Sequence, residues 1–168
     1  MAHPELELIR QRFHKACGYC GVTETDVGSE LTIDHYRPLA KGGGEDENNL
    51  IYACMKCNQF KGDFWPDDEQ IEQETRILHP FLDDLSAHLV VNVQTGYLEP
   101  ITKAGKFHIG LLRLNRPQLV EHRLVRQIQI LLIEKHRLLE RQIAELQKTI
   151  EVQENYIAML EAQMDENS

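Results

Sequence analysis

The chain has 168 residues, of which 42% are hydrophobic, and its formal net charge is −9 at pH 7. This length suits one modest domain with an extension, and the hydrophobic content predicts a packed core and excludes wholesale disorder. The N-terminus lacks the basic and apolar regions of a secretory signal, and the densest apolar run, 128–133, is far shorter than the ~20 residues that span a bilayer. We therefore expect a soluble, cytoplasmic protein with no membrane partner.

The first 66 residues are predicted to form short helices and strands around two cysteine pairs. Apolar side chains recur at helical spacing near the N-terminus, and glycines and prolines mark turns between the apolar runs that follow. The predicted elements are a helix over 5–16, a strand over 31–33, a glycine-rich loop at 42–44, a strand over 50–53 and a helix that carries 58–61. This order indicates a small α+β domain over residues 1–66.

Two further segments follow this domain. Residues 67–116 are predicted to form an α+β extension with a polar helix at 69–77, a β-hairpin at 89–98 and a helix at 105–113. From Pro117 to about Met164 there is no glycine or proline, which predicts one helix of roughly 70 Å at 1.5 Å per residue. The predicted third segment is therefore a long helix within 117–168.

The second half of this helix has apolar residues at alternating steps of four and three. The seam consists of Leu139, Ile143, Leu146, Ile150, Gln153, Ile157, Leu160 and Met164. Isoleucine at the a positions and leucine at the d positions of a heptad favour parallel two-stranded coiled coils. We predict a homodimer formed through residues 139–164, with an intramolecular helical layer as the alternative.

Four cysteines form two Cys-x-x-Cys pairs, Cys17 with Cys20 and Cys54 with Cys57. Each pair brings two thiolates onto one turn, and two such pairs complete a tetrahedral zinc site. Disulfides or free thiols are the alternatives, and a reducing cytosol disfavours disulfides. Since four sulfur ligands leave no open position, the predicted zinc is structural.

The stretch between the two pairs and just beyond them carries groups suited to phosphodiester chemistry. Asp34 and His35 end the first predicted strand, Asn49 precedes the second, and Asn58 directly follows the last cysteine. Histidine has an unperturbed pKa of ~6.5, which suits a general base near neutral pH. A carboxylate and an amide are oxygen ligands that suit Mg²⁺ or Mn²⁺.

This arrangement resembles the ββα-metal core of HNH endonucleases, in the variant where asparagine replaces the third letter, and the four-cysteine frame is similar to that of phage endonuclease VII. The resemblance implies a metal-dependent endonuclease in which His35 is the general base and Asp34 and Asn58 hold the catalytic Mg²⁺ or Mn²⁺. It also implies that Asn49 ties the loop around the base. Ordinary turn chemistry is the alternative for Asn49.

The net negative charge of the chain argues against strong non-specific binding of nucleic acid, because such binding requires a basic surface. Arg37 and Lys61 are candidate phosphate contacts, with solvated charges as the alternative. Six other histidines have no partner spacing and are expected to be ordinary packed or surface residues: His3, His14, His79, His88, His108 and His122.

The predicted function is hydrolysis of nucleic acid, and DNA is the expected substrate. A similarity of the segment Leu112–Arg123 to bacterial HNH proteins adds an expected role in phage defence. Two alternatives stay open, a non-catalytic zinc module that binds nucleic acid or protein, and an effector subunit that is silent until a partner such as an ATPase activates it.

Overall fold

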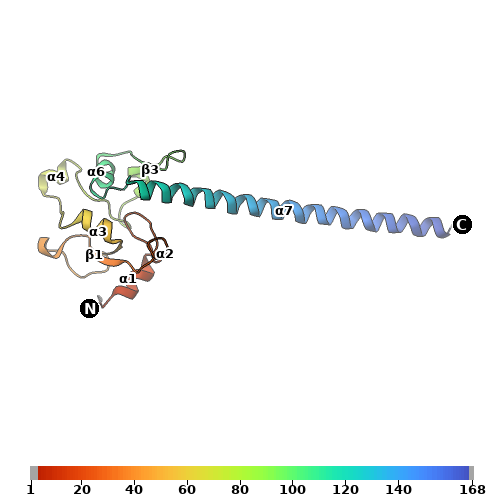
Figure 1. Cartoon of the computed structure of the whole chain (residues 1–168), viewed down its shortest axis with the longest axis horizontal. Helices are drawn as coiled ribbons and strands as arrows, with labels where there is room; N and C mark the ends of the chain where they lie inside the picture. The colour runs from red at the N-terminus through yellow and green to blue at the C-terminus, as the bar shows by residue number, and fades with distance from the viewer. Residues whose placement is uncertain (1–3, 167–168) are drawn as a thin grey trace. The chain divides into compact units, whose positions relative to one another are not determined.

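The computed structural model describes residues 4–166 and divides the chain into two compact units, 1–124 and 125–168. Its elements, many of which are labelled in Figure 1, confirm an α+β fold with small antiparallel sheets and a long C-terminal helix. They are α1 (Leu6–Arg12), α2 (Glu24–Val27), β1 (Thr32–His35), η1 (Leu39–Lys41), β2 (Leu50–Ala53), α3 (Met55–Lys61), α4 (Asp68–Glu72), α5 (Leu85–His88), β3 (Leu89–Val91), β4 (Leu98–Pro100), α6 (Lys103–Leu111) and α7 (Pro117–Glu166).

The hairpin of β1 and β2, followed by α3, is the part of the fold that positions the chemistry-bearing residues. The strands pair antiparallel with Asp34 opposite Ile51 and His35 opposite Leu50. All four residues of β2 are buried, which explains why its sequence is an unbroken apolar run. Since α3 begins two residues after β2 ends, the second cysteine pair is held at the base of the hairpin.

One hydrophobic core joins the N-terminal part of unit 1 to its C-terminal part. Ile9, Leu50 and Tyr52 are fully buried, and Leu112 and Leu114 belong to the same cluster. Burial of each large apolar side chain contributes roughly 1.5–3 kcal/mol, so contacts across this cluster are a substantial part of the stability of unit 1. An independently folding segment of residues 1–66 stays a prediction.

Two helices are shorter than their patterns predicted. The helix expected over 5–16 ends at Arg12, because His14 and Lys15 adopt left-handed backbone angles, with φ of 52° and 59°. The helix expected over 69–77 ends at Glu72, and Glu74 has φ of 58°. Neither position is a glycine, so the sequence carries no ordinary signal for these helix ends.

The long helix is confirmed as one element from Pro117 to Glu166. In unit 2, the seam residues are exposed in the single chain, with Leu139 45% exposed, Ile150 52% and Leu160 40%. Exposed apolar surface of this extent commonly marks an interaction site. Among the described residues, no helix is long and apolar enough to cross a membrane.

Several of the histidines left without a role are packing residues of unit 1, and His3 lies outside the described residues. His79 is buried, and its Nε2 lies 2.7 Å from the carbonyl oxygen of Asn48. His108 is 3% exposed, and its Nδ1 accepts a 3.0 Å hydrogen bond from the backbone N–H of Leu78. Both histidines therefore have structural partners.

The buried His108 makes stability depend on pH. Burial lowers the pKa of His108 to about 4, against ~6.5 in an unfolded chain. Because the unfolded chain binds the proton more readily, the full contribution is present above pH ~6.5 and is lost as the pH falls towards ~4, by about 3 kcal/mol in total. We expect His108→Asn, which keeps an acceptor for the Leu78 N–H, to lose this pH dependence. Denaturant unfolding of both proteins at pH 7 and pH 4.5 measures it, and equal pH slopes would rule out His108 as the cause.

Candidate active site and metal centre

The four cysteines converge at the base of the β1–β2 hairpin. Their sulfur atoms all lie within 4.8 Å of one another, and the Sγ atoms of Cys20 and Cys54 are 3.7 Å apart. Four sulfurs around zinc at ~2.3 Å in a tetrahedron would be separated by ~3.8 Å, so the spacing fits a metal site and is far too long for a disulfide. The predicted cysteine set is thus placed to bind a metal ion.

Local structure of the first pair explains this convergence. The backbone N–H of Cys17 donates to the carbonyl of Val22, and that of Gly18 donates to the carbonyl of Tyr52, which joins this turn to β2. A Cβ at Gly18 would lie 2.4 Å from the ring of Phe13, so a larger residue would push the turn out of place. Gly21 has φ of 76°, a left-handed angle that favours glycine.

The close approach of the four thiols shifts their pKa values in opposite directions. Contacts with the neighbouring thiols lower the pKa of Cys54 and raise the pKa of Cys57. One thiolate is thus stabilised by S–H donors, while further negative charge nearby is disfavoured. A bound cation removes this conflict, because it favours the thiolate form of all four ligands.

Asp34 is held in a buried network that links β1 to α3. It is 6% exposed, and its Oδ1 accepts a 2.9 Å hydrogen bond from the ammonium group of Lys61, while its Oδ2 accepts a 2.6 Å bond from the hydroxyl of Tyr19. Burial raises the pKa of Asp34, and the nearby charge of Lys61 opposes that rise. The result is a carboxylate in a fixed position at the end of the strand.

Lys61, predicted as a phosphate contact, is 2% exposed, and its ammonium group faces the protein interior. Besides Asp34, it donates a 2.6 Å hydrogen bond to the carbonyl oxygen of His35. A buried ammonium requires such partners, because an uncompensated charge in the interior is costly. Lys61 therefore positions both residues of the Asp34–His35 pair from α3.

His35 lies at the last position of β1 with its side chain 20% exposed. Its Nε2 is 3.1 Å from an Oε2 oxygen of Glu45 in the loop between the strands. If Nε2 carries the proton and donates it to Glu45, the lone pair lies on Nδ1, which is the form that a general base requires. No sequence pattern distinguishes Glu45, since it is one of three neighbouring acidic residues in the loop.

The Asn49 side chain closes the loop between β1 and β2. Its Oδ1 accepts from the backbone N–H of Arg37 at 2.7 Å, and its Nδ2 donates to the carbonyl oxygens of Arg37 and Gly44 at 3.0 and 2.7 Å. At Gly43 a Cβ would lie only 1.9 Å from the carbonyl oxygen of Arg37, so the loop needs glycine there. These contacts tie Arg37 and Gly44 to the Asn49 side chain across the loop.

Asn58 lies in the middle of α3, half-buried, one helical turn before Lys61. Residues three apart on a helix are neighbours, so Asn58 shares a face of α3 with the residue that contacts Asp34. Asn58 also lines a cleft of about 1070 Å³ whose walls come from the α2–β1 segment, α3 and the start of α7. The cleft is large enough to admit part of a polymeric substrate.

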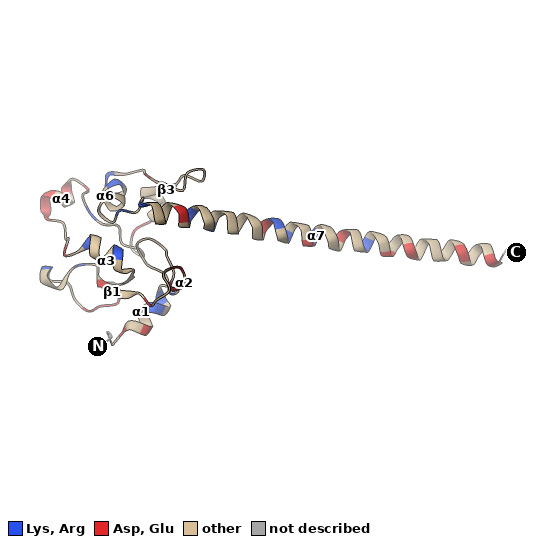
Figure 2. Ribbon diagram, viewed as in Figure 1, with Lys and Arg blue, Asp and Glu red and all other residues tan. Residues whose placement is uncertain are grey.

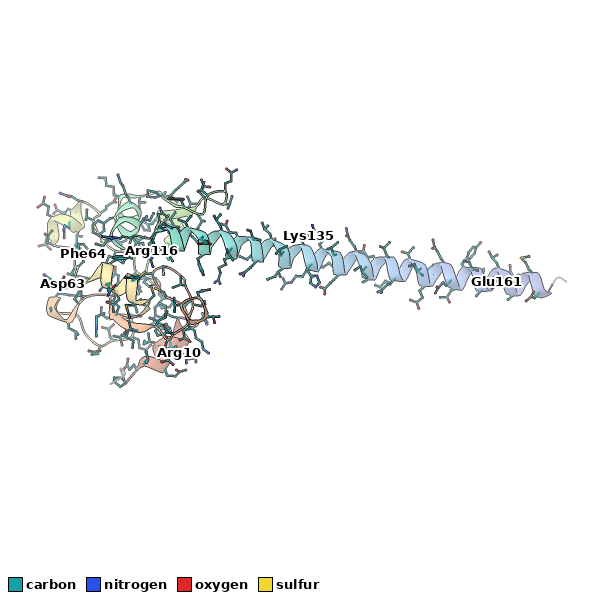
Figure 3. All side chains as sticks on the ribbon, viewed as in Figure 1. Arg10, Asp63, Phe64, Arg116, Lys135 and Glu161 are labelled. Atoms are coloured by element: carbon teal, nitrogen blue, oxygen red, sulfur yellow. The ribbon has the colours of Figure 1, made fainter. Side chains whose placement is uncertain are left out.

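Arg116 forms part of this cleft and contacts the cysteine cluster (Figure 3). One terminal nitrogen of its guanidinium group lies 4.0 Å from the sulfur of Cys54 and 3.9 Å from that of Cys57. A cation at this distance offsets part of the negative charge of a tetrathiolate site. Sequence reasoning missed this residue, because 59 positions separate it from Cys57.

Comparisons with known proteins agree with this geometry. Residues 17–64 match the family described as HNH endonuclease. We call this matched segment the HNH domain. It contains all four cysteines together with Asp34, His35, Asn49 and Asn58.

A curated relative gives a second match, again to an endonuclease. Over 67 residues the chain is 37% identical to the CRISPR-associated endonuclease Cas9 of Corynebacterium diphtheriae. The alignment covers 37% of this chain and 6% of Cas9, so the chain corresponds to a small part of that protein. No solved structure gave a significant match. Both matches support nuclease activity.

Proposed function

We propose that the HNH domain hydrolyses phosphodiester bonds of DNA with a catalytic Mg²⁺ or Mn²⁺ ion. The observation that carries this proposal is the Asp34–His35 pair at the end of β1, held through Lys61 against the helix that bears Asn58. A pure binding module has no need of a positioned carboxylate, imidazole and amide together.

The proposed ligands of the catalytic ion are Asp34 and Asn58. Both oxygens of Asp34 accept a hydrogen bond, but each carboxylate oxygen has two acceptor positions, so the carboxylate still has capacity for a cation. Carboxylate and amide oxygens are the donors that Mg²⁺ and Mn²⁺ prefer. When bound, such an ion stabilises the negative charge that develops on the phosphate.

His35 is the proposed general base. It takes the proton of the attacking water, and Glu45 orients the imidazole through Nε2. Lys61 fixes the strand end on which His35 is carried, so the base keeps its position while the proton moves. The expected products have a 5′-phosphate and a 3′-hydroxyl. The tetrathiolate site is proposed to hold structural zinc, which has no open position for chemistry.

Exposed basic residues are the proposed contacts of the DNA backbone. Arg37 is exposed beside the site, and Figure 2 shows lysine on α3 and a group of acidic residues on α4. We propose that the substrate enters on the side of Arg37 and α3. Purified protein incubated with plasmid, single-stranded DNA and RNA, each with Mg²⁺, Mn²⁺ or a chelator, tests the function. Cleavage of DNA that needs the added divalent ion supports it, and no cleavage of any substrate contradicts it.

We propose that the protein is a homodimer formed through the α7 seam. A parallel pair of helices would bury the seam that a single chain leaves exposed, and two sites related by two-fold symmetry suit cleavage of both strands of a duplex. We expect full-length protein to be a dimer in light scattering and a chain that ends at Leu138 to be a monomer. A full-length monomer, or a dimer that survives the truncation, would exclude α7 as the dimerising element. A partner ATPase and a role in phage defence stay predictions.

A further inference from the structure

A second hollow in unit 1 lies just beyond the C-terminal end of α3. It has a volume of about 180 Å³ and is lined by Tyr36, Phe64, Trp65, Pro66, Ile71, Arg76 and Ile77. Three of these seven residues are aromatic, and the surface that they expose is almost wholly apolar. Phe64, which is labelled in Figure 3, lies next to Asp63 in the segment just after α3.

The walls of this hollow are held in place by contacts with the rest of the domain. The hydroxyl of Tyr36 donates a 2.6 Å hydrogen bond to the carbonyl of Ile77, and the Tyr36 and Trp65 rings meet edge to face at 5.7 Å. Arg76 is paired with Asp83 through both terminal nitrogens, at 2.8 and 2.6 Å. A preformed, rigid hollow favours a ligand because little order has to be created on binding.

The charge around the hollow differs between its two sides. Arg37 lies over the Trp65 ring, with its guanidinium carbon 5.3 Å from the ring centre. On the other side, Ile71 belongs to α4, whose first turn carries Asp68 and Glu69. An anionic group is therefore favoured on the side of Arg37 and disfavoured beside α4. The hollow itself suits a flat, uncharged ring with a phosphate attached on the Arg37 side.

One wall of the hollow directly follows the proposed general base in the chain. Tyr36 and Arg37 directly follow His35, and consecutive Cα atoms are about 3.8 Å apart. One nucleotide advances about 3.4 Å along a stacked strand and further when it is unstacked. A strand with its scissile phosphate at His35 would then bring a neighbouring nucleotide to the side of Tyr36 and Arg37, and the Tyr36 ring meets the Trp65 ring at 5.7 Å.

We infer that this hollow binds an unpaired nucleobase of the substrate, stacked on Trp65, with Arg37 on the adjoining phosphate. The inference rests on the proposed function, since it names the part of the substrate that the same site takes. Aromatic side chains bind unpaired bases by stacking, worth ~1–3 kcal/mol per base. The site then selects DNA with an unpaired or unstacked base beside the cleavage point, as found in single strands, junctions and distorted duplexes.

The test uses the fluorescence of Trp65, which is the one tryptophan of the sequence. Full-length His35→Ala protein, used to suppress cleavage, is titrated in Mg²⁺ with a single-stranded oligonucleotide and with an abasic strand of the same length. We expect the first strand to quench Trp65 and the abasic strand to bind without quenching. Trp65→Leu should weaken binding of the first strand by roughly 5- to 150-fold, the stacking energy converted at 1.4 kcal/mol per tenfold.

A second variant keeps the fluorescent reporter. Ile71 is 51% exposed, so Ile71→Glu places a carboxylate at the hollow without disturbing the core, and it should abolish the quenching. Gln73→Glu, an equal charge change at an exposed position of the same segment outside the hollow, should leave it intact. Equal quenching by both strands, or no quenching at saturation, overturns the inference. If wild type cleaves DNA but the nucleobases of the single strand do not quench Trp65, the role of the hollow is wrong and the proposed function stands. If the single strand quenches Trp65 but wild type cleaves nothing, the proposed function is wrong and the role of the hollow stands.

Discussion

We expect His35→Ala to lower the rate of DNA cleavage by about 10²–10⁴-fold, the usual contribution of a positioned general base. The substitution removes the group that takes the proton of water and leaves Asp34, Lys61 and the cysteine cluster in place. Because the His35 side chain is at the surface end of β1, with 20% exposure, the thermal midpoint and the zinc content should change little. Single-turnover cleavage of a labelled duplex measures the effect.

His14→Asn is a matched control for this substitution. His14 is an exposed histidine with φ of 52°, an angle that asparagine adopts more readily than most residues. The control should cleave at the wild-type rate. If His35→Ala cleaves as fast as this control, the base is another residue.

The second large effect is expected for the cysteine cluster. Cys54→Ser should abolish stoichiometric zinc binding and the cooperative unfolding of unit 1, because the metal would join two cysteine pairs that lie far apart in the chain. Structural zinc sites contribute an apparent ~10–16 kcal/mol in small domains, which is the scale of the whole stability of a typical domain. Elemental analysis and thermal unfolding followed by circular dichroism measure the two effects.

Met55→Ala is the control for Cys54→Ser. Met55 is the neighbouring residue and is 71% exposed, so its truncation removes little buried surface. We expect one zinc per chain and wild-type unfolding for this variant. Wild-type protein purified without chelator and free of zinc, or a cooperative transition that survives in Cys54→Ser, would contradict a structural metal.

The features that the sequence predicts best are those set by short spacings. A Cys-x-x-Cys pair places two sulfurs on one turn wherever it occurs, and an apolar run such as Leu50–Ala53 has few alternatives to a buried strand. The Asp34–His35 pair at a strand end follows from the same local pattern. These features require no knowledge of how distant segments meet.

The features that sequence reasoning missed depend on tertiary contacts. Lys61 has the pattern of an exposed helix-end cation, and only the packing of α3 against β1, 27 residues away, turns it inward to Asp34. The contacts of Tyr19 with Asp34 and of Arg116 with the cysteines likewise join segments that no periodicity connects. The early ends of α1 and α4 lie at non-glycine residues with left-handed angles, for which tertiary packing is the stronger determinant.

The central claim is that the HNH domain cleaves DNA by attack of water on a phosphodiester bond. Cleavage by the full-length protein in H₂¹⁸O with Mn²⁺, followed by mass spectrometry of the product ends, tests it most directly. Attack by water places one ¹⁸O atom on the new 5′-phosphate and leaves an unlabelled 3′-hydroxyl. We expect this pattern from wild type, and a much smaller amount of the same labelled product from His35→Ala. Products with unlabelled 5′-phosphates, label on a 3′-phosphate, or no products at all would contradict the mechanism.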